Sequence, residues 1–253
     1  MRFYDFPEAS DLFYTDQFFD ECVSFYKEIF EKKKYKDFLD CAVGTGQMLL
    51  PLAKMGYNVT GTDINQNMLN KANVNFSTNK VSANFTVCDF RNLKEKLRYE
   101  YDCVLCTGNS IGHVKNEDID AVIKSMDSVL RPGGMIFIDS KNWEKVLQRK
   151  QRFYLFNPAI RDRGRINYIQ IWDYNSDGSI LFNYLIFEEI DNKIVSKRQF
   201  YEFYYPFNIE LILDSLKELD YVDINVCKLG DTSVKDLEKI DWYAITAVKK
   251  IAL

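Results

Sequence analysis

The sequence predicts an α/β protein: a doubly wound, mostly parallel, seven-stranded Rossmann-like sheet with a small antiparallel β insert. Two observations lead to this prediction. From residue 37 onward, short apolar runs alternate with helix-length segments, a pattern typical of βαβ units and a parallel sheet. Residues 165–205 then hold three β-rich runs joined by short polar turns, which favour antiparallel hairpins.

The elements of the parallel part follow one another in a regular order. The expected strands are 38–43, 58–64, 84–88, 101–107 and 135–139, followed by later strands near 221–228 and at 242–248. The expected helices are 17–34, 48–55, 65–78, 118–130 and one near 208–219. Gly56 is a stop signal for the second helix, and Arg131-Pro132-Gly133-Gly134 is expected to close the helix over 118–130.

These elements predict three parts of the chain. Residues 1–36 are expected to form an N-terminal helical cap, and residues 37–150 with 206–253 the core. The antiparallel insert is expected over 151–205, where it could cover the carboxyl ends of the strands as a lid over an acceptor site. Its β runs are Arg165–Tyr174, Ser179–Ile190 and Ile194–Tyr205.

Composition narrows the class of protein. The chain has 253 residues, of which 47% are hydrophobic, enough for a sizeable core. Its net charge of −4 argues against a nucleic-acid partner. We find no apolar run of membrane-spanning length and no apolar signal region, so we expect a cytoplasmic protein without a membrane partner. The single histidine, His113, excludes a histidine-rich metal site, and the six cysteines are expected to be buried free thiols.

A glycine turn and three acids mark a ligand site. Gly44-Thr45-Gly46 follows the first strand and opens a helix, which allows a tight turn and close approach of a ligand. Asp63 and Asp89 end the second and third strands, where ligands bind in such sheets. Asp63 is placed to accept hydrogen bonds from ribose hydroxyls, and Asp89 lies where the adenine edge of an adenosine is expected.

Two adenosine ligands compete for this site, a dinucleotide and S-adenosylmethionine. A dinucleotide site favours a third glycine, but Leu49 stands at that position. Asp40 places a negative charge beside the turn, which suits a cationic methionine moiety better than a pyrophosphate. We therefore expect S-adenosylmethionine as cofactor, with S-adenosylhomocysteine as product. The alternatives are a non-catalytic regulatory protein that binds an adenosine cofactor and an NAD-dependent oxidoreductase.

These segments resemble a known family. Leu39–Gly46 is similar to the first motif of class I methyltransferases, and Gly61–Ile64 with Met68-Leu69 is similar to the second. Gly108-Asn109-Ser110, followed by His113, resembles the glycine N-methyltransferase group. Further similar segments are Arg131–Gly134, Asp139–Trp143 and Tyr204-Tyr205-Pro206. The resemblance is clear over residues 37–143.

The resemblance implies roles for individual residues. The residues expected around the cofactor are Asp40, Ala42, Gly44, Gly46, Asp63, Ile64, Met68, Asp89, Phe90, the backbone near Cys106, and His113. Those expected to hold the methyl acceptor are Asn109, Lys141, Tyr184 and Tyr204, with looser matches at Tyr154 and Tyr14.

One departure from the family bears on the acceptor. The family places an arginine at the position of Lys141, and lysine keeps the charge but loses the bidentate fork. Glycine itself is therefore doubtful, whereas a small anionic or amino-acid-like acceptor still fits. We expect methyl transfer to a small molecule, with nitrogen favoured and oxygen possible with the same site. The sequence leaves open whether the protein is a monomer or a homo-oligomer.

Overall fold

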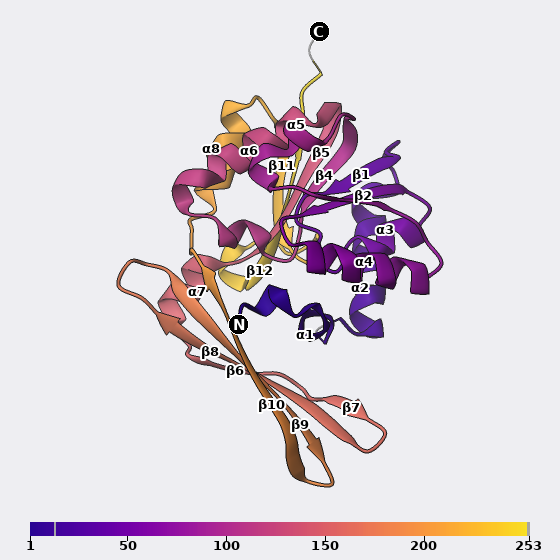
Figure 1. The fold of residues 1–253 in the computed structure, drawn as a ribbon. Helices are drawn as coiled ribbons and strands as arrows, with labels where there is room; N and C mark the ends of the chain where they lie inside the picture. The colour runs from indigo at the N-terminus through magenta and orange to yellow at the C-terminus, as the bar shows by residue number, and fades with distance from the viewer. Residues whose placement is uncertain (13, 252–253) are drawn as a thin grey trace.

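A computed structural model describes residues 1–12 and 14–251 and shows a central seven-stranded sheet (Figure 1). The strand order is β11-β12-β5-β4-β1-β2-β3. Strand β12 runs antiparallel to both β5 and β11, and the other neighbouring pairs are parallel, so the mostly parallel sheet is confirmed. In chain order its strands are β1 (Asp37–Asp40), β2 (Asn58–Asp63), β3 (Asn84–Val87), β4 (Tyr101–Cys106), β5 (Leu130–Lys141), β11 (Val222–Lys228) and β12 (Trp242–Val248).

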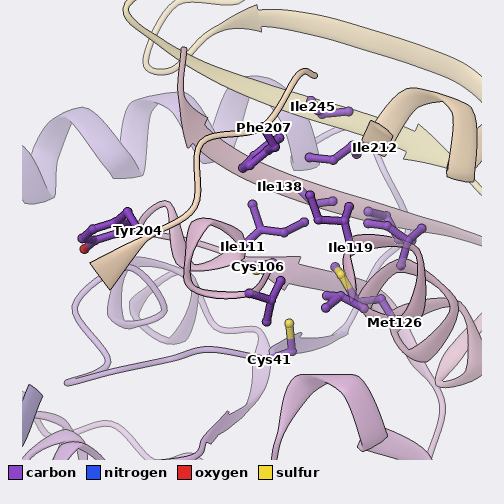
Figure 2. Packing of buried hydrophobic residues seen from close by; sticks show 14 of the residues in the cluster. Cys41, Cys106, Ile111, Ile119, Met126, Ile138, Tyr204, Phe207, Ile212 and Ile245 are labelled. Atoms are coloured by element: carbon purple, nitrogen blue, oxygen red, sulfur yellow. The ribbon is translucent and has the colours of Figure 1, made fainter. Parts of the chain in front are cut away.

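Successive side chains along the strands of this sheet belong alternately to two hydrophobic clusters, one on each face of the sheet. Phe38 packs with helices α2 (Asp16–Phe30), α3 (Leu50–Lys54) and α4 (Gln66–Thr78), whereas the adjacent Leu39 belongs to the opposite cluster. Helices α6 (Ile119–Ser128) and α8 (Glu210–Glu218) supply the cluster on that opposite face. Figure 2 shows this packing, with Ile138 of β5 near Ile119 and Ile212. Because both faces of the sheet are buried, the central strands have continuous apolar runs in the sequence.

Short helices account for most of the elements that sequence reasoning missed. They are α1 (Pro7–Asp11), α5 (Leu93–Lys96), α7 (Trp143–Arg149), and the 3-10 segments η1 (Phe3–Asp5), η2 (Phe90–Asn92), η3 (Ser110–His113), η4 (Asn116–Asp118) and η5 (Leu237–Lys239). None is longer than two turns, so hydrophobic periodicity has too few residues in which to show itself.

The prediction that Arg131–Gly134 closes a helix over 118–130 is wrong, because α6 ends at Ser128. Strand β5 begins at Leu130, which pairs with Tyr101, and continues through these residues. Gly133 has a φ of 78°, and the register between β4 and β5 shifts at this end of the strand. The Pro-Gly-Gly run therefore makes an irregular strand start rather than a separate loop, because glycine adopts the left-handed backbone without strain.

The antiparallel insert is a second sheet, with order β10-β9-β8-β6 and β7 paired to β8. Its strands are β6 (Phe153–Leu155), β7 (Ala159–Arg161), β8 (Gly164–Tyr174), β9 (Ile180–Ile190) and β10 (Lys193–Tyr204). Sequence reasoning missed the two three-residue strands and found the three long ones. The sheet extends away from the core as a long arm (Figure 1). Its inner face, with Trp172, Phe182 and Tyr184, joins the core cluster.

The N-terminal segment lies between the core and this arm (Figure 1). The buried carboxylate of Glu202 accepts hydrogen bonds from Arg2 Nε at 3.1 Å and the Phe3 amide at 2.9 Å. Phe3 stacks on Tyr184 with ring centroids 4.2 Å apart. On the core side, Asn65 Nδ2 donates to the Tyr4 carbonyl at 2.9 Å. These contacts tie residues 2–4 to both sheets. Among the described residues, we find no helix with the length and apolar character needed to cross a membrane.

Candidate active site

The glycine turn after β1 is held against the end of β2. Gly44 has a φ of 54° and Gly46 one of 83°, the region that favours glycine. A Cβ on Gly46 would lie 2.8 Å from Phe76 Cε2, so α4 packs directly on the turn. Gly44 donates its amide to Asp63 Oδ2 at 2.9 Å. The turn and the second strand thus form one rigid unit.

Asp63 and Ile64 present a polar and an apolar surface side by side. Asp63 Oδ1 accepts the Asn65 amide at 2.8 Å, and burial raises the pKa of its carboxyl. Each carboxylate oxygen keeps further acceptor capacity. Ile64 is 70% exposed and Met68 is buried beneath the turn, with its Cε 3.6 Å from where a Gly44 Cβ would be. We call Gly44, Asp63, Ile64 and Asp89, which the sequence predicts to lie around the cofactor, the cofactor edge.

Asp89 and Phe90 complete this edge in a different way. Asp89 follows β3, and its carboxylate accepts from Arg91 Nη2 at 2.7 Å and Arg91 Nε at 3.1 Å. The Arg91 hydrogen bonds hold the pKa of the Asp89 carboxyl below its usual value. Phe90 is half-buried beside it. Asp89 is therefore an ionised acceptor, and Arg91, which sequence reasoning did not single out, orients it.

Asp40 lies deeper than expected. Its side chain is fully buried, and it accepts the Thr107 hydroxyl at 2.6 Å and the Ala42 amide at 3.1 Å. Burial raises the pKa of this carboxyl to about 7. Asp40 therefore joins the turns after β1 and β4, and Cys106, at the end of β4, is buried as well.

Asp139 organises the turn after β4. This fully buried carboxylate accepts the Gly108 amide at 3.0 Å, the Asn109 amide at 3.1 Å and Trp242 Nε1 at 2.8 Å. Burial raises its pKa to about 6. Asn109 is held there with a φ of 62°. Sequence reasoning missed Asp139 as a site residue, although it is the last residue of the strand expected over 135–139.

Asn109 and Lys141 lie together at the end of β5. Asn109 Oδ1 accepts from Ser140 Oγ at 2.8 Å and from the Lys141 amide at 3.0 Å, which leaves the Asn109 NH2 group to donate. Lys141 Nζ lies 4.3 Å from the Trp242 ring centroid and 5.5 Å from that of Trp172. Burial lowers the pKa of Lys141 to about 8. A cation is thus held between aromatic rings of the core and the insert.

Three tyrosines and the single histidine form a directed hydrogen-bond chain. His113 Nδ1 lies 3.1 Å from the Phe203 carbonyl, which only accepts, so this nitrogen carries the proton. Burial lowers the pKa of His113 to about 4, so the ring is neutral and its Nε2 accepts from Tyr4 at 3.0 Å. The Tyr4 hydroxyl lies 2.9 Å from that of Tyr204, which lies 3.4 Å from that of Tyr184.

We call Tyr4, His113, Lys141, Tyr184 and Tyr204 the acceptor wall, because the sequence predicts that Lys141, Tyr184 and Tyr204 hold the acceptor. His113, expected at the cofactor, is tied here to Tyr4 and the insert. Tyr4 had no role in the sequence prediction, because a tyrosine in an aromatic N-terminal segment carries no motif. The looser matches lie nearby.

Those two looser matches occupy different positions. Tyr154 stacks on Trp172 with ring centroids 3.9 Å apart. Tyr14 is half-buried, and desolvation of its hydroxyl together with the nearby Asp139 raises the pKa of that hydroxyl. Tyr154 therefore lies on the insert side of Lys141, whereas Tyr14 lies on the Asp139 side.

The described residues contain no cluster of histidine, cysteine and acidic side chains able to hold a metal ion. All six cysteines are buried free thiols. The prediction of unpaired thiols is confirmed.

Part of this chain is similar in sequence to known proteins. Residues 38–134 match the family described as "Methyltransferase domain". A glycine/sarcosine N-methyltransferase from Parasynechococcus marenigrum is 28% identical over 125 residues, covering 49% of this chain and 44% of that relative. The chain thus spans less than half of that relative's length.

Solved structures share the fold along nearly the whole chain. An S-adenosylmethionine-dependent methyltransferase from Clostridium acetobutylicum has a TM-score of 0.77 at 18% identity, covering 96% of this chain and 97% of that one. An amino pentose methyltransferase from Micromonospora echinaspora has a TM-score of 0.76 at 14% identity, covering 99% and 98%. Residues 38–134 thus match a methyltransferase domain, and nearly the whole chain has the fold of these solved methyltransferases.

Proposed function

We propose that this protein transfers a methyl group from S-adenosylmethionine to the nitrogen of a small-molecule amine. The methyltransferase-domain match over residues 38–134 is the observation that carries the proposal. The relatives support it: one is named a glycine/sarcosine N-methyltransferase, and one structure is a cofactor-bound amino pentose methyltransferase.

The residues of the cofactor edge fit this cofactor. A Cβ on Gly108, which has a φ of 70°, would meet nothing within 4 Å, so the turn after β4 borders open space. Asp63 offers a carboxylate for ribose hydroxyls, and the exposed Ile64 offers an apolar surface for the adenine. Asp40 and Asp139 put two buried acids behind the turns, which favours a cationic ligand.

When bound, S-adenosylmethionine supplies a methyl group already activated on a sulfonium, so the protein mainly positions and desolvates the acceptor. The acceptor wall favours nitrogen over oxygen. Burial keeps Tyr184 and Tyr204 protonated, and the neutral His113 already accepts from Tyr4. A neutral amine attacks with its own lone pair, whereas an alcohol needs a strong base that this wall does not offer.

Asn109 and Lys141 would hold the acceptor. The Asn109 NH2 group donates to a polar group of the acceptor, since its oxygen is occupied by Ser140 and Lys141. The Lys141 ammonium, sparsely solvated between two indoles, pairs with an anionic or hydroxyl group. Both contacts fix the amine without consuming its lone pair.

The test is an assay with methyl-labelled cofactor against amino acids, amino sugars, simple amines and phenols. We expect label in an amine, with little in the phenols. Calorimetry with S-adenosylhomocysteine tests the cofactor separately. Cofactor binding without turnover on any acceptor would contradict the enzyme reading, and preferential labelling of phenols would contradict the nitrogen assignment.

A further inference from the structure

The insert sheet has an apolar outer face that the core does not cover. Cross-strand pairing puts Leu155, Ile169, Leu185 and Gln199 in one row on this face, because paired residues project to the same side. The row Phe153, Ile171, Asn183 and Tyr201 lies next to it, and beyond that lies the row Asp173, Leu181 and Phe203. Toward the tip follow the row Asn167, Phe187 and Lys197 and the row Ile160, Arg165, Glu189 and Ile194.

The outer face exposes more apolar side chains than the single, scattered ones that are normal on a protein surface. Leu155 is 77% exposed, Ile160 72%, Ile194 63% and Phe153 53%. Among the described residues, the core clusters take inner-face side chains such as Trp172 and leave out every side chain of the outer rows. A single-layer sheet that is apolar on both sides is expected to bury its second side against another layer.

We propose that the outer face of the insert sheet is the interface of a homodimer, with the two insert sheets packed face to face. Its size fits this occupant. Strand β8 and strand β9 each have 11 residues. Strands β8, β9 and β10 cover about 14 Å by about 36 Å, and the three-residue strands β6 and β7 beside β8 add about 100 Å², which makes on the order of 600 Å² per copy. A stable interface buries about 600–1,000 Å² per partner.

The charges on this face are self-complementary. Arg165 pairs with Glu189 in the tip row, and Arg152 pairs with Asp173 in the row at the other end. The middle row holds no charge. A two-fold axis between the sheets, crossing the strands at this row, exchanges the two ends while it keeps β8 over β8. Arg165 of one copy then faces Asp173 of the other.

The same two-fold rotation also places apolar residues of one copy opposite apolar residues of the other. Leu185 and Ile169, at the centre, face their own counterparts, and Ile194 faces Phe203 of the other copy. Lys197 meets Tyr201, a cation–aromatic pair. Face-to-face packing of identical apolar sheet surfaces at about 10 Å is the ordinary arrangement of layered β-sheets. The rows of the outer face contain no cluster of unpaired charges that would bind a charged partner such as nucleic acid or an acidic peptide.

Sedimentation velocity of the full chain over a dilution series tests the proposal. We expect a dimer for the natural sequence and a monomer for the double variant Leu155→Glu/Ile194→Glu, because four carboxylates then meet in an apolar interface. Both positions are exposed in the single chain, so folding should be unaffected, as circular dichroism and the melting temperature will show. Val74→Glu, at a position 56% exposed on α4, is the matched control and should stay dimeric.

A second variant keeps the proposal falsifiable. Leu185→Glu, on the two-fold axis, should weaken the dimer more than Ile160→Glu at the rim, since its charge meets its own copy. A natural chain that stays monomeric up to about 100 μM, where a dimer with a micromolar Kd would be mostly formed, overturns the proposal. So does a monomer that sediments with phosphatidylcholine vesicles, or a folded double variant that remains dimeric.

Discussion

The cofactor edge lies within one stretch of chain, residues 44–89, whereas the acceptor wall joins residues as far apart as Tyr4 and Tyr204. The cofactor edge is fixed by backbone amides that donate to strand-end carboxylates, as Gly44 does to Asp63. The acceptor wall is fixed by side chains of three separate segments. We therefore expect the proposed cofactor half of the site to form with the core alone, while the proposed acceptor half needs the N-terminal segment and the insert in place.

The largest expected effect falls on the cofactor edge. Asp63→Ala removes the carboxylate placed for two ribose hydroxyls, so S-adenosylmethionine should bind about 30-fold to 100-fold more weakly, or about 2–3 kcal/mol. Calorimetry measures this directly. Asp63→Asn keeps one acceptor oxygen for the Asn65 amide and should lose less.

Asp177→Ala, in the exposed hairpin turn of the insert, is the control and should bind the cofactor normally. Unchanged cofactor affinity in Asp63→Ala would remove the ribose assignment. It would also contradict the proposed difference between the cofactor edge and the acceptor wall.

The next effect falls on the acceptor wall alone. Lys141→Met keeps the apolar stem between the tryptophans and removes the charge, so KM for an anionic acceptor should rise about tenfold while cofactor affinity stays the same. Lys141→Arg should retain most of the affinity. Steady-state kinetics with the acceptor found in the labelling assay provides the measurement, and an equal loss of cofactor affinity would contradict the separation of the two halves.

Lys141 also predicts a pH dependence. Because burial lowers its pKa to about 8, the ammonium is present below that pH and is lost above it. Affinity for an anionic acceptor should therefore fall as the pH rises through about 8. In Lys141→Arg the fall should be absent, since guanidinium stays charged. A KM that does not change between pH 7 and 9 in the natural protein would contradict the contact.

A smaller effect tests the hydrogen-bond chain. Tyr4→Phe keeps the ring beside His113 and removes the hydroxyl that links it to Tyr204, so turnover should drop about fivefold to tenfold. Cofactor affinity should be unchanged. Tyr99→Phe, at a tyrosine 78% exposed, is the matched control. Full activity in Tyr4→Phe would show that the N-terminal segment supports the wall by packing only.

The smallest effect is on stability. Burial raises the pKa of Asp40 to about 7, above its unfolded value, so the folded state binds the extra proton between these pH values. Stability from this group is therefore present at low pH and falls as the pH rises toward about 7. His113 has the opposite shift, to about 4, so its contribution rises over the acidic range and is complete near its unfolded value.

The variant Asp40→Asn isolates the Asp40 contribution. Its melting temperature should fall less than that of the natural protein between pH 5 and 8, as measured by calorimetry. Parallel curves for the two proteins would show that Asp40 is ionised throughout.

The sequence by itself determined the sheet, the glycine turn and the strand-end acids. Each of these rests on short-range geometry: Gly44 must turn after β1, and Asp63 ends a strand whose carboxyl end faces the same edge. The acceptor wall, in contrast, depends on how distant elements pack in the tertiary structure. Tyr4 reaches His113 and Tyr204 only because Phe3 and Glu202 anchor the N-terminal segment on the insert. No local pattern records such contacts, since they join residues about 100 to 200 positions apart and depend on how separate elements pack.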